Sequence, residues 1–194
     1  TIVSGTYGAF GSERNIKNYA HGQFQSVYDY PYLSSSANHI FDITMGYDES
    51  CALSASSNVQ NAKKINMYNQ MSQVLLGYTG ADDTVEIFEA DLDFSDDTAT
   101  AQMKYCYFLS LSRLITKDQV KKGTFSITIG TGSNWDQPFN AATGSITLSD
   151  VSASDTGGTN NKGNSGQYGV LYNTDKRVSN VGHGLIFYQA GVVV

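Results

Sequence analysis

The chain has 194 residues, enough for one domain with its own hydrophobic core. Hydrophobic residues make up 40% and charged residues only 15%, a balance opposite to that of disordered chains. The net charge of −6 argues against nucleic acid as a partner, because phosphate binding needs clustered Lys and Arg. No window approaches the roughly 18 apolar residues of a membrane helix. Residues 1–11 lack a signal-peptide pattern, so we expect synthesis in the cytoplasm.

The first part of the chain predicts an extended arm followed by strands. We assign residues 1–37 to an arm that ends in a first strand, because aromatic and polar side chains alternate from Gly22 to Tyr32. Residues 39–47 alternate more cleanly and predict a second strand. This second strand begins the main β-rich domain, which we assign to residues 38–194.

One long helix is predicted over residues 58–76. Ser57 with Gln60 matches a capping box at its start, and Gly77 stands where a left-handed residue commonly ends a helix. Apolar side chains recur along the segment at spacings of three and four residues, which predicts one continuous apolar stripe. The stripe consists of Val59, Ala62, Ile65, Tyr68, Met71, Val74 and Leu75.

The remaining pattern is mostly that of strands. Residues 105–111 are apolar on both faces and predict a central strand. Residues 152–167 are almost wholly small and polar, which predicts a surface loop. Together the elements predict a mainly β fold with minor α, either sandwich-like or a mixed open sheet, with the long helix and a short one at about residues 116–122. Further strands are predicted within residues 84–94, 102–114, 123–130, 145–151 and 167–173.

The last 13 residues, 182–194, are predicted to form an apolar strand. An uncovered edge of this kind is prone to aggregate, so the strand needs cover from its own fold or from a partner. Either it pairs with another subunit or the chain continues beyond Val194. We favour the second, in which the sequence is the amino-terminal part of a longer chain.

Signatures of catalysis are missing from the sequence. His21, His39 and His183 each stand alone, and neither GxSxG nor HExxH occurs. We therefore assign no catalytic residue, no cofactor site and no metal site, and do not expect an enzyme. Cys51 and Cys106 lack metal-ligand spacing; a disulfide between them stays open, but buried free thiols are favoured.

The densest acidic cluster is formed by Asp91, Asp93, Asp96 and Asp97. It does not fit an EF-hand, because the Gly and the bidentate Glu of that loop are replaced. An irregular calcium site remains the alternative to a solvated acidic turn, which we favour.

Tyrosines and the terminal valines are the candidate contact residues. A tyrosine ring offers rigid apolar area with a polar tip, which suits protein interfaces or carbohydrate stacking. Ordinary strand packing is the simpler explanation for most of the tyrosines. The interface candidates are Tyr28, Tyr30, Tyr32, Tyr188, Val192, Val193 and Val194.

Four segments in the second half of the chain carry a resemblance. They are LITKDQVKKGTFSITIG, SITLSD, QYGVLYN and GHGLIFYQAGVVV, at residues 114–130, 145–150, 167–173 and 182–194. In order and spacing they resemble large tail and baseplate structural proteins of contractile-tailed marine and cyanobacterial bacteriophages. The likeness covers mainly residues 81–194, and it carries over no functional residue.

This resemblance implies a structural subunit of a phage virion, in the tail, baseplate or neck, that acts by protein–protein assembly in several copies. Its partners would be other virion proteins and copies of itself, without nucleic acid and without membrane insertion, and its location the virion after synthesis in the host cytoplasm. The alternative is a receptor- or glycan-binding module of a tail appendage. A weaker third reading, a polysaccharide hydrolase, would need two carboxylates facing each other across a cleft.

Overall fold

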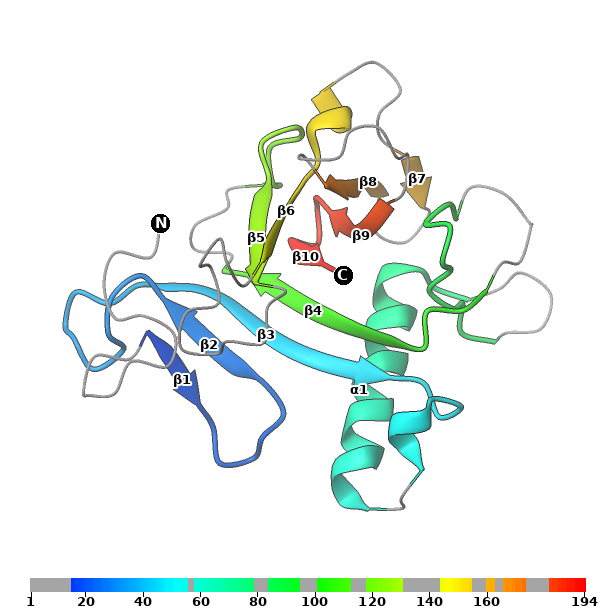
Figure 1. Ribbon diagram of the computed structural model, residues 1–194, viewed down its shortest axis with the longest axis horizontal. Helices are drawn as coiled ribbons and strands as arrows, with labels where there is room; N and C mark the ends of the chain where they lie inside the picture. Colours follow the sequence, from blue (N-terminus) through cyan, green and yellow to red (C-terminus); the bar gives the residue numbers. More distant parts are fainter. Residues whose placement is uncertain are drawn as a thin grey trace.

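The computed structural model describes residues 15–55, 58–78, 84–94, 101–112, 118–130, 144–154, 160–162, 166–173 and 182–194. These residues form one antiparallel sheet and one long helix that packs against it (Figure 1). The fold is therefore mainly β with minor α, as predicted, and its sheet is open and curled. The strands are β1 (Ile16–Asn18), β2 (Gln25–Tyr28), β3 (His39–Tyr47), β4 (Tyr105–Leu111), β5 (Ser126–Gly130), β6 (Ser145–Ser149), β7 (Asn160–Lys162), β8 (Gly166–Asn173), β9 (Gly182–Phe187) and β10 (Val192–Val193); the helices are α1 (Val59–Leu75) and the 3₁₀ turns η1 (Ala52–Ser54) and η2 (Val151–Ser154).

The sheet follows the order β1-β2-β3-β4-β10-β9-β8-β6-β5, with β7 paired to β8 off this path. Its longest register joins β3 to β4, from Phe41 opposite Leu111 to Tyr47 opposite Tyr105. β4 lies between β3 and β10, which confirms the prediction that this doubly apolar strand is central. The first two strands belong to the same sheet, because β2 pairs with β3.

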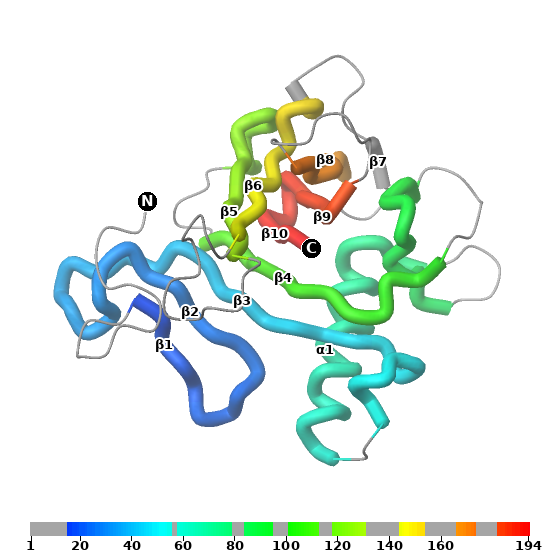
Figure 2. The backbone as a smooth tube through the Cα atoms, viewed as in Figure 1, coloured from blue at the N-terminus to red at the C-terminus, as the bar shows by residue number. Residues whose placement is uncertain are grey.

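The terminal segment is a hairpin rather than the single strand predicted. β9 ends at Phe187, and the chain turns back at Gly191, whose φ of 66° is easily reached only by glycine. Val192 then lies opposite Ser110 of β4 on one side and Phe187 of β9 on the other. The strand therefore finds both of its pairing partners within its own chain, and Figure 2 shows the last residues beside β9 and β4.

Helix α1 confirms the predicted helix, with one change at its start. Asn58 is the N-cap, and its side chain accepts a hydrogen bond from the Asn61 amide at 2.8 Å. The predicted cap, Ser57, lies outside the described residues. Gly77 follows the helix with a φ of 96°, the left-handed conformation predicted for it.

Apolar side chains fill both faces of the sheet. The face toward α1 buries aromatic rings from the helix, β4, β8 and β9, and the opposite face packs β4, β9 and β10 against the β5–β6 hairpin. The helix-side cluster contains Tyr68, Leu75, Leu76, Phe88, Leu92, Phe94, Cys106, Phe108, Tyr168, Leu185, Phe187 and Val192. The opposite cluster contains Leu109, Leu148, Ala153, Leu171, Ile186, Tyr188 and Val193.

Three predicted elements are wrong in the described residues. Residues 152–167, predicted as a surface loop, contain the end of η2, the strand β7 and the start of β8. Residues 84–94 form no strand, although isolated bridges join Val85 to Tyr78 and Glu89 to Gln102. Phe88, Leu92 and Phe94 instead fill the helix-side core from an irregular segment, so burial rather than ladder pairing explains their spacing. Residues 118–122 form a bend and a turn instead of the short helix; residues 116 and 117 are outside the described part.

Candidate functional site

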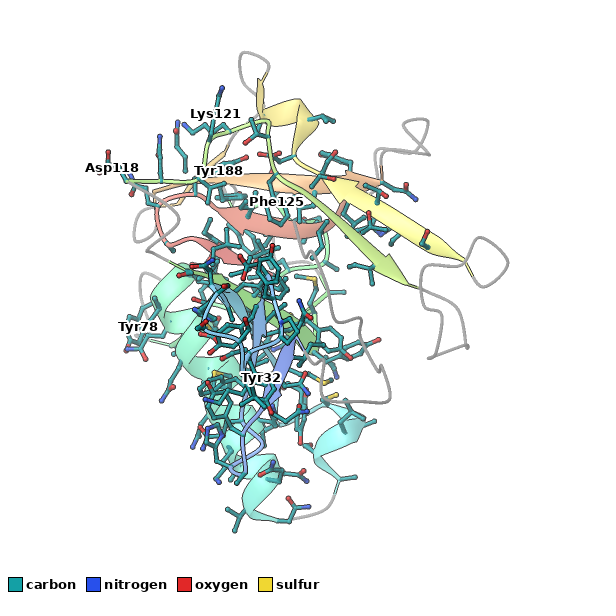
Figure 3. All side chains as sticks on the ribbon, turned by 90° about the vertical axis from the view of Figure 1, so that its left-hand side faces the viewer. Tyr32, Tyr78, Asp118, Lys121, Phe125 and Tyr188 are labelled. Atoms are coloured by element: carbon teal, nitrogen blue, oxygen red, sulfur yellow. The ribbon has the colours of Figure 1, made fainter. Side chains whose placement is uncertain are left out.

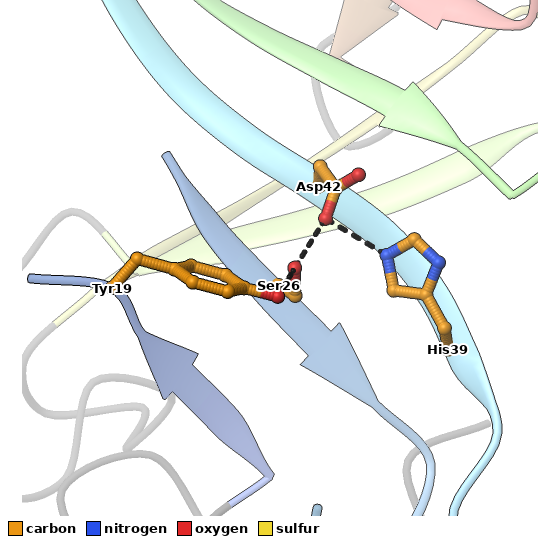
Figure 4. A network of polar contacts seen from close by, with 4 residues as sticks. All are labelled: Tyr19, Ser26, His39 and Asp42. Carbon is orange, nitrogen blue, oxygen red and sulfur yellow. Dashed lines mark hydrogen bonds and ion pairs between the residues drawn. The ribbon is translucent and has the colours of Figure 1, made fainter. Parts of the chain in front are cut away.

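A polar network links the turn after β1 to β2 and β3 (Figure 4). Ser26 of β2 lies opposite Asp42 of β3, and its hydroxyl donates to the Asp42 carboxylate at 2.5 Å. His39 Nε2 lies 2.9 Å from the same carboxylate oxygen, and the Tyr19 hydroxyl lies 3.1 Å from Ser26 Oγ. Antiparallel pairing places Ser26 and Asp42 on one face, which is why a short serine side chain can reach the carboxylate.

A bulge brings His39 into this network. Strict alternation would send His39 and Asp42 to opposite faces of β3. The register instead slips between Val27, which faces Phe41, and Tyr28, which faces His39. The extra residue on β3 turns His39 back toward the carboxylate, a common effect of β-bulges. This contact was missed at the sequence level, where each histidine was taken as isolated.

The geometry does not match a hydrolytic triad. Such a triad requires histidine between the serine and the carboxylate, so that its ring can accept the serine proton. Here Asp42 occupies the middle and accepts from both Ser26 and His39. We therefore interpret the network as a clamp that ties β2 to β3 beside a solvent-accessible surface.

A hollow of about 240 Å³ lies next to this clamp, at the edge of β3. Pairing of β2 with β3 starts at Gln25 and Ile43, so the remainder of β3 has no β2 residue beside it. The turn between β1 and β2, helix α1 and β4 enclose the space at that edge. We call it the β3-edge hollow; it is lined by Asn18, Tyr19, Gly22, Gln23, Phe24, Gln25, Ile43, Thr44, Met45, Lys64 and Tyr107.

Lys64 brings a positive charge into the β3-edge hollow. Its ammonium donates to the Gln23 carbonyl at 2.9 Å and to Thr44 Oγ1 at 3.3 Å. Burial lowers the pKa of Lys64, because removal from water disfavours the charged form. Among the described residues the one ion pair joins His39 to Asp42, so no carboxylate there pairs with Lys64. A lysine four residues before the buried Tyr68 was the available sequence signal, since both lie on one side of the helix.

The interface candidates divide into two groups. Tyr188, Val192 and Val193 are buried in the sheet and unavailable to a partner in this fold, although Val194 is partly accessible. Tyr30 is exposed, and Tyr28 and Tyr32 are partly exposed and lie near each other, with ring centroids 6.3 Å apart. Figure 3 shows the separation: Tyr188 lies near Phe125 in one half of the molecule and Tyr32 lies in the other.

The start of α1 presents apolar side chains that the described residues leave uncovered. The continuous stripe predicted along the helix is buried only toward its end, at Tyr68 and Leu75. Val59 is 73% exposed, and Leu53 in the neighbouring η1 is 53% exposed. Figure 1 shows this half of α1 extending past β3 beside η1. An open hollow of about 840 Å³ lies there, lined in part by Val59, Ala62 and Ile65.

Other candidates gain no support as metal or redox sites. Asp91 accepts from the Asp93 amide at 3.2 Å, as in a turn, and Asp96 and Asp97 lie outside the described residues. No group of three potential ligands for a metal ion occurs in the part of the chain that the structure describes. Cys51 and Cys106 are both buried and free, as favoured from the sequence.

Comparison with known proteins gives no relative: no family model, curated protein or solved structure matches this chain. Within the described residues, no helix has the length and apolar character needed to cross a membrane.

Proposed function

We propose that this chain is a structural subunit of a bacteriophage virion, in the tail, baseplate or neck, and that it acts by protein–protein assembly rather than by catalysis. The observation that carries the assembly role is the uncovered apolar start of α1. The resemblance of the second half of the chain to phage tail and baseplate proteins supplies the virion context.

The described parts of the segments that carry the resemblance lie together in space. Residues 168–172 are in β8, which pairs with β9, and β9 pairs with β10. Residues 120–125 join them through two hydrogen bonds: the Val120 amide donates to Tyr188 O, and the Phe125 amide donates to the Asp150 carboxylate. The likeness therefore falls on the framework of the fold, which suits a family that shares an assembly role rather than an active site.

The uncovered surface is suited to a partner. Val59, Ala62 and Ile65 continue the stripe that α1 buries further along, and Leu53 of the neighbouring η1 is also exposed. Burial of one valine side chain stabilises a complex by about 1.5–3 kcal/mol. The terminal strand no longer supports the proposal, because its edges are paired within the chain.

Sedimentation of the purified chain over a range of concentrations tests the assembly role, with a second copy as the partner. We expect self-association that weakens about tenfold or more in Val59→Gln, from the loss of one buried valine. The matched control is Val74→Gln on the same helix, where the valine is 64% exposed but outside the patch. A monomer at every concentration, or equal effects of the two variants, would contradict the role proposed for this surface.

The virion location has its own test. Antibodies raised against the purified chain should label the tail, baseplate or neck of purified phage particles that encode it, as seen by immunogold electron microscopy. Protein that stays in the infected cell and is missing from purified particles would refute the virion assignment, whatever the sedimentation result.

A glycan-binding module of a tail appendage is the second candidate. One observation favours it: Tyr107 is 58% exposed and forms part of the β3-edge hollow, beside Lys64 and several amide side chains. Exposed aromatic rings next to hydrogen-bonding groups suit recognition of a sugar ring.

A further inference from the structure

The β3-edge hollow combines three kinds of binding group from separate parts of the chain. Lys64 comes from α1, the aromatic rings come from the β1–β2 turn and β4, and the amides come from β1, the turn and β2. The chain must fold before any of these groups meet. Their combination is more informative than each group alone, because each restricts the ligand differently.

The cation favours an anionic group. A lysine ammonium has three donors, and Lys64 uses two of them on Gln23 and Thr44. A second positive charge lies close by, since Lys17 Nζ is 5.0 Å from the centre of the Tyr19 ring that lines the hollow. The neighbouring clamp contains one carboxylate, that of Asp42, and its Oδ1 already accepts hydrogen bonds from Ser26 and His39. A ligand carboxylate would supply the negative partner that Lys64 lacks among the described residues.

The rings favour a flat apolar surface on the ligand. Tyr19 and Phe24 pack together with ring centroids 4.9 Å apart, and Tyr107 lines the hollow from β4. Tyrosine rings bind with little entropic cost because few torsions must be fixed. The carbon-bound hydrogens on one face of a sugar ring provide a matching surface.

The amide side chains and the volume of the hollow favour a ligand with one hydroxylated ring. Gln23, Gln25 and Asn18 carry both donors and acceptors, as hydroxyl recognition requires. Gln25 is itself oriented by a hydrogen bond to Asn18. The volume of about 240 Å³ is below the lower end of drug-sized sites, about 300 Å³, and suits a single sugar residue.

We propose that the β3-edge hollow binds one ring of an acidic sugar of the uronate class, with the carboxylate at Lys64 and the ring against Tyr107. The inference rests on the glycan-binding candidate above and goes beyond it in naming the site and the charge of the ligand. It does not depend on assembly through α1.

Calorimetric titration with methyl glucuronide and methyl glucoside tests this site, because the two differ by a carboxylate in place of a hydroxymethyl group. We expect glucuronide to bind wild type at millimolar concentrations, as for single-ring ligands held by few contacts, and at least about tenfold more tightly than glucoside. Lys64→Met should remove that preference. Lys63→Met removes the same charge from the neighbouring position, which does not line the hollow, and should leave it unchanged.

A second pair of variants tests the ring contact without disturbing a hydrogen bond of Lys64. Tyr107→Ala should weaken glucuronide binding several-fold, since it removes the exposed ring against which the sugar would pack. Tyr105→Ala is the control, because Tyr105 is similarly exposed at 61% on the same strand but does not line the hollow. Thermal unfolding of each variant identifies a loss of binding that comes from misfolding.

The outcomes separate the inference from the function on which it rests. Equal binding of glucuronide and glucoside, or equal effects of Lys64→Met and Lys63→Met, would overturn the acidic-sugar inference while leaving glycan binding in place. Absence of binding by either sugar to the folded wild type at about 10 mM would overturn both, since that limit corresponds to less than about 3 kcal/mol.

Discussion

Replacement of Gly46 by alanine tests how closely α1 approaches the sheet. Gly46 lies in β3 beneath the helix, and an added Cβ would lie 2.8 Å from the Tyr68 backbone nitrogen and 3.0 Å from Tyr68 Cα. Ordinary contacts between heavy atoms start at about 3.5 Å, so the helix would have to retreat by roughly 0.7 Å. Because the nearest atoms belong to the backbone, a change of rotamer cannot relieve the clash.

The retreat would loosen the aromatic cluster beneath the helix. The Tyr68 ring contacts Phe88 and Phe108 edge-on, with centroids 5.7 and 6.5 Å away, and the Tyr68 hydroxyl donates to Met103 O at 2.7 Å. Overpacking of this kind typically costs about 1–3 kcal/mol. For a chain of this size, each kcal/mol lowers Tm by about 2–4 °C.

Urea denaturation and differential scanning calorimetry measure this effect on Gly46→Ala. The control is Val74→Ala, a substitution on the exposed side of the same helix that should change stability by less than about 0.5 kcal/mol. If Gly46→Ala unfolds at the same urea concentration and temperature as wild type, the close contact between α1 and β3 is wrong.

Three further perturbations have expected outcomes. Burial raises the pKa of the Cys106 thiol from 9.0 to about 12, so its stabilising effect is complete below about pH 9 and is lost as pH rises toward 12. Over this pH range the thiol lowers the free energy of unfolding by about 1.4 kcal/mol per pH unit. Unfolding followed by circular dichroism should therefore show a smaller loss of stability with pH in Cys106→Ala than in wild type. Equal losses in the two proteins would contradict a buried thiol. The buried Asp150 accepts from the Gly123 and Phe125 amides, both at 2.8 Å, and from the Tyr188 hydroxyl at 3.0 Å. Asp150→Asn should therefore lower the free energy of unfolding in urea by about 2 kcal/mol or more, and Tyr188→Phe should lower it by less. Because the two side chains are in contact, the double variant should lose a different amount from the sum of the single variants. Additive losses would argue against the contact. Deletion of residues 192–194 removes the strand between β4 and β9 and should abolish cooperative unfolding, whereas retention of a sharp transition would show that β10 is dispensable.

The local spacing of apolar residues was sufficient to predict β3 and α1. Residues 39–47 alternate over nine positions and form β3, and the three- and four-residue spacing before Gly77 produces α1. The double-sided apolar run at residues 105–111 correctly predicted a strand with a neighbour on each side. Its first part is covered on one face only, since Tyr105 and Tyr107 are 61% and 58% exposed. In contrast, residues 84–94 have strand-like composition but fill the core irregularly, since burial satisfies apolar side chains without requiring a ladder.

The candidate sites depended on tertiary structure to a greater extent. Lys64 and Tyr107 are 43 positions apart in the sequence, and they line one hollow only because α1 and β4 both lie next to the end of β3 that β2 does not cover. The contact between His39 and Asp42 depends on a bulge, which no alternation pattern reveals.

For the terminal segment, too, the sequence determined one property and the tertiary structure decided another. Its apolar composition established from sequence alone that residues 182–194 must be covered, because such a strand is unstable in water. Composition does not specify what covers it. The reversal at Gly191 and the gap between β4 and β9 decided that the chain's own strands do so. β10 pairs with β9 across a local turn and with residues of β4 that are more than 80 positions earlier in the sequence.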